Sequence, residues 1–242
     1  MSPLLITSLA LAGLVAGPGL RAVIIRYAVP AGEPARRCCP ACERQLMARW
    51  PPLPPDGRCP GCQQRIGPPA LAVEVTAAIL LGALAARVHP GLVLAAACWL
   101  ALCAVPLVFI DAAVRRLPDP LTAIAYAGTT VLLMLAAAAS GHWHDMARAA
   151  LGALALAGFY LALALISPAG MGMGDVKAAA STGTLLAWSS WRLLIAGGFA
   201  GFFLAAVYGI ALLISGRATR GQQIPFGPFM IAGAFLVILA AG

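Results

Sequence analysis

Eight long apolar runs, separated by short polar connections, dominate this 242-residue chain. A run of roughly 20 apolar residues can cross the hydrocarbon core of a bilayer as a helix. The runs are continuous and do not alternate with polar residues, which favours helices over a membrane β-barrel. Charged residues make up only 10% of the chain, whereas a soluble domain typically carries about 25%. The predicted fold class is an all-α polytopic membrane protein with about eight transmembrane helices, at residues 3–20, 71–86, 91–110, 121–139, 149–166, 176–188, 193–214 and 225–241.

The distribution of basic residues predicts the orientation of these helices. If the N-terminus lies outside, one side of the membrane receives only Arg87, Arg148 and Arg192, and the other side receives the remaining Lys and Arg residues. Loops rich in Lys and Arg stay in the cytoplasm. The net charge of +8 is therefore interpreted as a topology signal. Nucleic-acid binding is not expected, because the basic residues are divided among separate loops and lack interleaved aromatic residues.

The only substantial polar segment, residues 28–70, carries two cysteine pairs. Cys39 and Cys42 form one C-x2-C pair, and Cys59 and Cys62 form the other. This spacing is typical of a four-cysteine, zinc-ribbon-like structural site, which leaves no open coordination position for catalysis. Two disulfides are the alternative, but they require the segment to lie on the oxidising side, against the charge bias. The predicted organisation is a first helix at 1–27, a cytoplasmic insert at 28–70, and a seven-helix membrane core at 71–242.

Two aspartates stand at the cytoplasmic ends of apolar runs. Asp111 follows the run at 91–110, and Asp175 precedes the short run at 176–188. Carboxylates at a bilayer edge are costly and usually functional. Two carboxylates at one depth can share a proton, so that one activates a water and the other donates a proton, as peptide hydrolysis requires. Gly172 and Gly174 would allow irregular backbone beside Asp175.

Structural explanations of these residues remain open at this point. Asp175 could pair with Lys177 or cap the following helix. Lys177 could support Asp175, or its ammonium group could simply reach the membrane surface. Glu74 could bind a cationic substrate group or contact the cysteine insert, or it could be an ordinary interfacial glutamate.

The chain also resembles a known family, the type IV prepilin peptidases of the GxGD aspartyl protease class. Five motifs carry this resemblance, and they occur in order along nearly the whole chain. They are Asp111 with Asp119 in the segment 117–119, the segment Gly172-Met173-Gly174-Asp175-Val176-Lys177, the segment Ile224-Pro225-Phe226-Gly227-Pro228-Phe229, the cysteine motif at 57–62, and Val73-Glu74-x-Thr76.

The resemblance implies a membrane endopeptidase of the bacterial inner membrane. Its substrates would be prepilins and pseudopilins, whose cationic leader peptides are cleaved at the cytoplasmic face by Asp111 and Asp175. Many members with the cysteine insert also methylate the new N-terminus using S-adenosylmethionine. Arg21 stands where the family usually has an asparagine, a departure that concerns methyl transfer more than proteolysis. The oligomeric state stays open.

Two functions from other classes are the alternatives. A proton- or cation-coupled transporter would use the same buried carboxylates for binding, and a non-catalytic assembly scaffold would depend on the zinc insert. The ordered motifs favour the peptidase over both.

Overall fold

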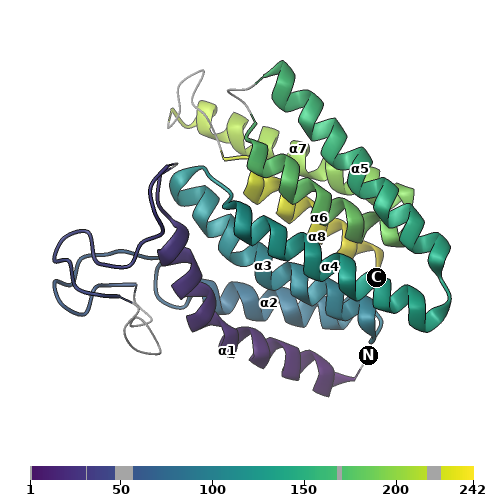
Figure 1. The fold of residues 1–242 in the computed structure, drawn as a ribbon, viewed down its shortest axis with the longest axis horizontal. Coiled ribbons are helices and arrows are strands. Elements are labelled where there is room, and N and C mark those ends of the chain that lie inside the picture. Colours follow the sequence, from purple (N-terminus) through teal and green to yellow (C-terminus); the bar gives the residue numbers. More distant parts are fainter. Residues whose placement is uncertain (1, 31, 47–56, 168–170, 217–224) are drawn as a thin grey trace.

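The computed structural model describes residues 2–30, 32–46, 57–167, 171–216 and 225–242, and their regular structure is helical (Figure 1). The two isolated β-bridges of the described residues lie in the segment between the first two helices. The predicted all-α fold is therefore confirmed. The described residues form eight helices: α1 (Pro3–Tyr27), α2 (Ala72–Arg87), α3 (Leu92–Val114), α4 (Asp119–Ser140), α5 (Trp143–Ile166), α6 (Met173–Ser189), α7 (Trp191–Ile214) and α8 (Gly227–Ala241).

Five of these helices, α1, α3, α4, α5 and α7, are long and apolar enough to cross a membrane. Helices α2, α6 and α8 are shorter, with 16, 17 and 15 residues. Two helix boundaries differ from the predicted runs in a way that matters for the aspartates. Helix α3 continues past Asp111 to Val114, and α6 already begins at Met173. Both aspartates therefore lie within helical turns. The helical backbone hydrogen bonding extends beyond the apolar run, at its end in α3 and at its start in α6.

Helices that are consecutive in the chain pack as antiparallel neighbours, and the three most extensive contacts are those of α5 with α6, α1 with α2, and α7 with α8. Glycine lets the backbones approach closely in these pairs. A Cβ atom on Gly13 would lie 2.7 Å from the backbone of Ala77, and one on Gly233 would lie 2.4 Å from the backbone of Gly201. Small residues are common where helices meet in a membrane. Burying apolar surface between helices gains little free energy over exposing it to lipid, so close backbone packing stabilises the contact instead.

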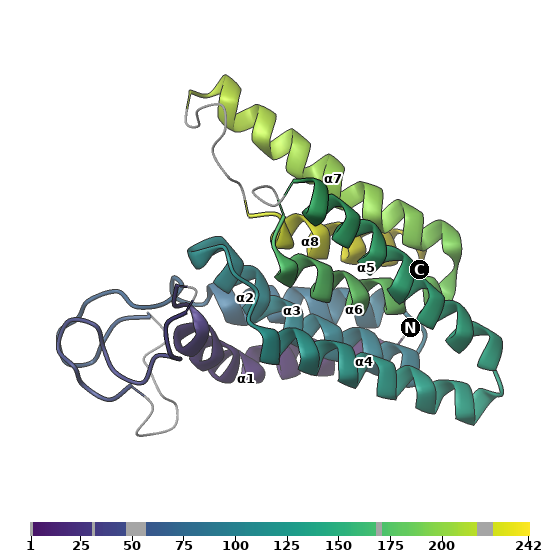
Figure 2. The ribbon, with the colours of Figure 1, turned by 45° about the horizontal axis from the view of Figure 1, so that its top comes forward.

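The segment between α1 and α2 projects from one end of the bundle, while both chain termini lie toward the other end (Figure 1). The view turned by 45° shows the same separation (Figure 2). Because the helices alternate in direction, the end of α3 and the beginnings of α6 and α8 all lie at the end of the bundle that carries this segment. This is the end at which the two aspartates are found.

Candidate functional site

Asp175 is the third residue of α6 and caps the beginning of that helix. Its Oδ2 accepts a hydrogen bond from the backbone N–H of Gly172 at 3.0 Å, in the way that the acidic residue of a capping box does. The residue is only 8% exposed. The capping interaction fixes the orientation of the carboxylate, so that one oxygen is held by the backbone and Oδ1 is left to face elsewhere.

Asp111 lies in the last turn of α3. Its backbone carbonyl accepts a hydrogen bond from the N–H of Arg115, the residue that ends the helix in the left-handed conformation with φ 53°. The Asp111 side chain is buried and points into the bundle, where its residue exposure is 5%. A buried carboxylate at a helix C-terminus gains nothing from the helix dipole, so it needs a compensating interaction nearby.

The two carboxylates meet at Gly227, the first residue of α8. A Cβ atom built on Gly227 would lie 2.8 Å from Asp111 Oδ2 and 3.3 Å from Asp175 Oδ1, so the two oxygens are no farther apart than the sum of these distances. The same two oxygens are buried and have no hydrogen-bond partner among the described residues. Buried polar atoms are normally satisfied, and exceptions often mark a bound water or a catalytic role. The arrangement therefore leaves two carboxylate oxygens free, facing one small space beside a glycine.

Gly172 and Gly174 contribute differently from the expected loosening of the backbone. Gly172 has φ −84° and ψ 152°, extended values that any residue can adopt, and its contribution is the N–H that caps Asp175. Gly174 is needed for space, because a Cβ atom there would lie 2.7 Å from Cβ of Leu117. It lets the beginning of α6 pack against the link between α3 and α4, which brings Asp175 toward the end of α3.

Lys177 is bound to a different carboxylate from the expected one. Its Nζ lies 2.7 Å from Oδ1 of Asp119, the first residue of α4. This pair joins the beginnings of α4 and α6 at the end of the bundle that carries the two buried aspartates. Both side chains are substantially exposed, 46% for Lys177 and 71% for Asp119.

Glu74 forms a buried ion pair with Arg21, which links α1 to α2. Arg21 donates from Nε to Oε1 of Glu74 at 3.1 Å and from Nη2 to Oε2 at 2.6 Å. Its Nη1 and Nη2 groups also donate to the backbone carbonyls of Pro68 and Pro69, which lie shortly before α2 in the chain. Glu74 thus reaches the cysteine segment through Arg21. Since both side chains are less than a tenth exposed, this bidentate pair with its added carbonyl acceptors satisfies an otherwise expensive pair of buried charges.

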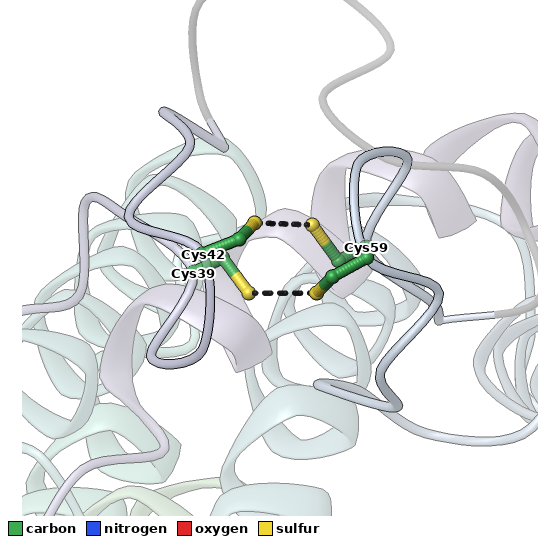
Figure 3. Close-up of side chains that lie close together, drawn as sticks. Cys39, Cys42 and Cys59 are labelled. Carbon is green, nitrogen blue, oxygen red and sulfur yellow. Dashed lines mark hydrogen bonds between the residues drawn. The ribbon is translucent and has the colours of Figure 1, made fainter.

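The four predicted zinc ligands come together in the segment between α1 and α2, and Figure 3 labels three of them, Cys39, Cys42 and Cys59. The sulfur atoms of Cys39, Cys42, Cys59 and Cys62 all lie within 4.8 Å of one another. The Cys39–Cys62 and Cys42–Cys59 sulfur pairs are each 3.6 Å apart. Four sulfurs around a tetrahedral zinc, at Zn–S distances of about 2.3 Å, are separated by about 3.8 Å. A disulfide would need the sulfurs about 2.05 Å apart. The arrangement therefore fits a metal ion and not two disulfides.

The two cysteine turns have the same backbone design. The N–H of Cys39 bonds to the carbonyl of Arg44 in the first turn, and the N–H of Cys59 bonds to the carbonyl of Gln64 in the second. The residue after each second cysteine, Glu43 or Gln63, has a positive φ. An isolated antiparallel bridge closes each turn. Two similar turns facing each other present two thiols each, which is how a closed four-thiolate site is built.

The charges within this cluster also favour a cation. Backbone N–H groups of Cys62 and Gly61 lower the pKa of Cys59 to about 6. The Arg44 backbone N–H acts to lower the pKa of Cys42, but burial and the three neighbouring cysteines together raise it to about 12. Four thiols this close cannot all ionise without a positive ion between them, and thiolates are the form that binds metal. Cys38 is exposed and lies outside the cluster.

An apolar cavity of about 340 Å³ lies between α2, α3 and α8. Phe109 and Pro228 line one part of it, and these residues are close in the chain to Asp111 and Gly227. A second cavity, of about 230 Å³, lies between α5 and α7 and is lined by apolar residues including Phe159 and Phe202. Neither cavity is lined by a charged side chain, so neither fits S-adenosylmethionine, whose charged amino-acid portion needs polar partners.

The sequence pattern of the type IV leader peptidase family matches residues 94–214, a range that includes both buried aspartates. A protein named prepilin leader peptidase/N-methyltransferase, from Aeromonas salmonicida (strain A449), is 32% identical over 216 residues, which cover 84% of this chain and 71% of the relative. The chain belongs to the type IV leader peptidase family. It is therefore a membrane peptidase, and the enzyme class expected from the motifs is confirmed.

Two further relatives of the peptidase carry the same name. The Dichelobacter nodosus protein is 32% identical over 221 residues, covering 85% of this chain and 71% of the relative. The Neisseria gonorrhoeae protein is 27% identical over 214 residues, covering 84% and 70%. No solved structure matches the chain.

The structure adds three residues to the site that the sequence reasoning did not assign to it. Gly227 lies against both carboxylates, and the Phe226-Gly227-Pro228 start of a helix was its signal in the sequence. Arg21 pairs with Glu74, and its signal was a charge near the end of one apolar run facing an opposite charge near the start of the next. Tyr160, on α5, is completely buried near the start of α8, and a lone tyrosine in an apolar run gave no signal.

Proposed function

We propose that this peptidase cleaves the leader peptide from type IV prepilins and pseudopilins, with Asp111 and Asp175 as the catalytic pair. The single observation that carries this proposal is that both unpartnered carboxylate oxygens face the same space beside Gly227. The names of the relatives supply the substrate class. The five ordered motifs match Asp111 and Asp175 to the catalytic aspartates of the family.

The proposed reaction is hydrolysis without a covalent intermediate. A water bound between the two carboxylates loses a proton to the ionised one, and its oxygen attacks the carbonyl carbon of the scissile peptide. The protonated carboxyl group gives its proton to the carbonyl oxygen as the tetrahedral intermediate forms. When the intermediate collapses, the carbon–nitrogen bond breaks, and the leaving nitrogen takes the proton that came from the water. One hydroxyl group of the intermediate returns its proton to the carboxylate that had protonated the carbonyl oxygen. The products are a leader peptide with a new carboxyl group and a mature pilin with a new amino group.

A prepilin also fits the surroundings of this site. Its leader is cationic and polar, and the segment that follows is an apolar helix. The apolar cavity between α2, α3 and α8 adjoins the end of the bundle where Asp111 and Gly227 lie. An apolar helix lying along this face would place its polar junction at the carboxylates. The site would be at the cytoplasmic face, because the end of the bundle that carries it also receives most of the basic loops.

We further propose that the four cysteines hold one structural zinc ion in a cytoplasmic insert spanning residues 28–70, between the first helix at 1–27 and the core at 71–242. Ile25 of α1 packs in one small core with Cys39, Leu46 and Cys59. A core of this size cannot order a segment by itself, and a metal ion would supply the missing stability. Zinc bound by four thiolates has no open position, so its role is to shape the insert and not to activate water.

N-methylation of the new amino group is a second candidate activity, favoured by the shared name of the relatives and by the cysteine insert. Both activities are tested by mass spectrometry of the mature N-terminus of a candidate prepilin, co-expressed with and without this protein. We expect the leader to be removed only when the protein is present. The added mass of one methyl group on the mature N-terminus would establish the second activity, and an intact leader would contradict the first.

A further inference from the structure

Tyr160 of α5 carries a buried hydroxyl group that the reaction described so far does not use. The residue is 0% exposed, and its hydroxyl has no hydrogen-bond partner among the described residues. A buried hydroxyl without a partner is destabilising, so a position that retains one needs an explanation. Phenylalanine would fill the same space without leaving a polar atom unsatisfied.

The Tyr160 ring packs against the beginning of α8, the part of the chain that lies beside both carboxylates. The ring centroids of Tyr160 and Phe226 are 5.6 Å apart, and Phe202 completes the stack at 4.9 Å from Phe226. Phe226 is the residue immediately before Gly227, the glycine that faces both carboxylates. Tyr160 thus packs against the residue that precedes Gly227, and Gly227 lies beside the carboxylates of Asp111 and Asp175.

The hydroxyl of Tyr160 also lies within electrostatic reach of Asp175, the charged group that acts on it. Helices α5 and α6, which carry the two residues, form the most extensive helix contact in the bundle. Three of the six buried polar atoms that lack a partner among the described residues belong to side chains that pack near the beginning of α8: Asp111 Oδ2, Asp175 Oδ1 and Tyr160 Oη. Two of these are acceptors when ionised, and the hydroxyl is the only hydrogen-bond donor of the three in that state.

We propose that the Tyr160 hydroxyl donates a hydrogen bond to one bound water, which in turn donates to Oδ1 of Asp175 and holds this carboxylate facing Asp111. Tyr160 is then a positioning residue, since it acts through Asp175. This inference rests on the proposed function of the two aspartates. It accounts for a polar atom at a fully buried position of α5, the helix that packs against α6, where the other oxygen of Asp175 is already fixed by the N–H of Gly172.

A merely structural role for Tyr160 makes the opposite prediction. If its ring only packs against Phe226, then Tyr160→Phe removes an unsatisfied hydroxyl and leaves the packing intact. The variant would be as stable as the parent protein or more stable, and its kcat would not change. If the hydroxyl positions Asp175, the variant is equally stable but kcat falls, because the geometry of the reacting groups is lost and substrate binding is not.

The test measures kcat and KM separately for cleavage of a prepilin by the purified full-length protein in detergent, together with its thermal unfolding midpoint. We expect Tyr160→Phe to lower kcat by about 10- to 100-fold, a part of the 10²–10⁴-fold that general acid–base groups contribute. KM and the unfolding midpoint should stay close to those of the parent. Tyr208→Phe is the matched control, because Tyr208 of α7 also stacks on a phenylalanine of α8, at 5.1 Å from Phe229, but is 46% exposed.

The outcomes separate this inference from the proposed function. An unchanged kcat for Tyr160→Phe, or a fall matched by Tyr208→Phe, would overturn the role of Tyr160 while leaving the aspartate pair standing. A parent protein that does not cleave any prepilin would overturn the proposed function itself, whatever the tyrosine variants do.

Discussion

Oδ2 of Asp111 and Oδ1 of Asp175 face the same point beside Gly227, although the two residues belong to different helices. Each oxygen is buried, and neither has a hydrogen-bond partner among the described residues. The remaining oxygen of Asp175 is held by the backbone of its own helix. This combination of one fixed oxygen and two free ones is what a pair of carboxylates needs in order to hold a water between them.

Gly227 should be the residue at which the smallest substitution most disturbs this pair. In Gly227→Ala, the added methyl group would lie 2.8 Å from Asp111 Oδ2 and 3.3 Å from Asp175 Oδ1, and it would push both side chains away. We expect the rate of prepilin cleavage to fall by about 100-fold, the scale of a misplacement of about 1 Å. Gly158→Ala is the control, because a methyl group on Gly158 meets nothing within 4 Å. Equal activity of the two variants would mean that the space beside Gly227 is not where the reaction occurs.

The buried pair of Arg21 and Glu74 should contribute to stability and not to chemistry. Removing one partner, as in Glu74→Leu or Arg21→Met, leaves the other charge or its donors without compensation. Breaking a buried ion pair in this way costs about 3–5 kcal/mol. Denaturant unfolding in mild detergent should show this loss for each single variant. The double variant Arg21→Met/Glu74→Leu should be less destabilised than the sum of the two single variants, and simple additivity would show that the two side chains do not act as a pair.

The cysteine cluster should bind one zinc ion per chain. Metal analysis of the purified protein should find about one zinc, as in closed four-thiolate sites. Cys59→Ser should lose the metal and make the segment between α1 and α2 sensitive to limited proteolysis. Cys38→Ser should retain both properties, because Cys38 is exposed and outside the cluster. Finding no metal in the parent protein, with all four thiols free, would contradict a zinc site.

Lys177 should act through Asp119, the carboxylate that it contacts. An ion pair this exposed contributes only about 0–1 kcal/mol to stability. Lys177→Met and Asp119→Asn should each lower the cleavage rate by no more than several-fold, and the double variant should resemble either single one. A strong effect of Lys177→Met alone would instead indicate that the ammonium group acts directly on Asp175. The cleavage rates of the three variants, measured at one substrate concentration well below KM, distinguish these cases.

Much of the fold follows from the sequence, because in a membrane the apolar runs determine where helices form. The eight helices were predicted from such runs, with boundaries that differ mainly where polar residues extend a helix. Asp111 illustrates this, since hydrophobicity ended the run before it while backbone hydrogen bonding carries α3 on to Val114. The cysteine spacing likewise predicted which four sulfurs converge.

Contacts between helices were harder to predict, because hydrophobicity along one run does not reveal which side chains face another helix. Lys177 follows Asp175 closely in the sequence, and only the packing of α4 against α6 shows that it contacts Asp119 instead. Gly227 and Tyr160 enter the site through the packing of α8 and α5, which no local pattern encodes. The pairing of Glu74 with Arg21 was likewise not predicted, although opposite charges near the facing ends of two consecutive apolar runs were visible in the sequence.

The central claim is that Asp111 and Asp175 together carry out the cleavage. The most direct measurement is the rate of leader removal from one prepilin by the parent protein, Asp111→Asn and Asp175→Asn, each purified and matched by its unfolding midpoint. We predict that each variant remains folded and loses about a thousand-fold or more in rate, as expected when a general acid–base group is removed. Normal cleavage by either folded variant would contradict the claim.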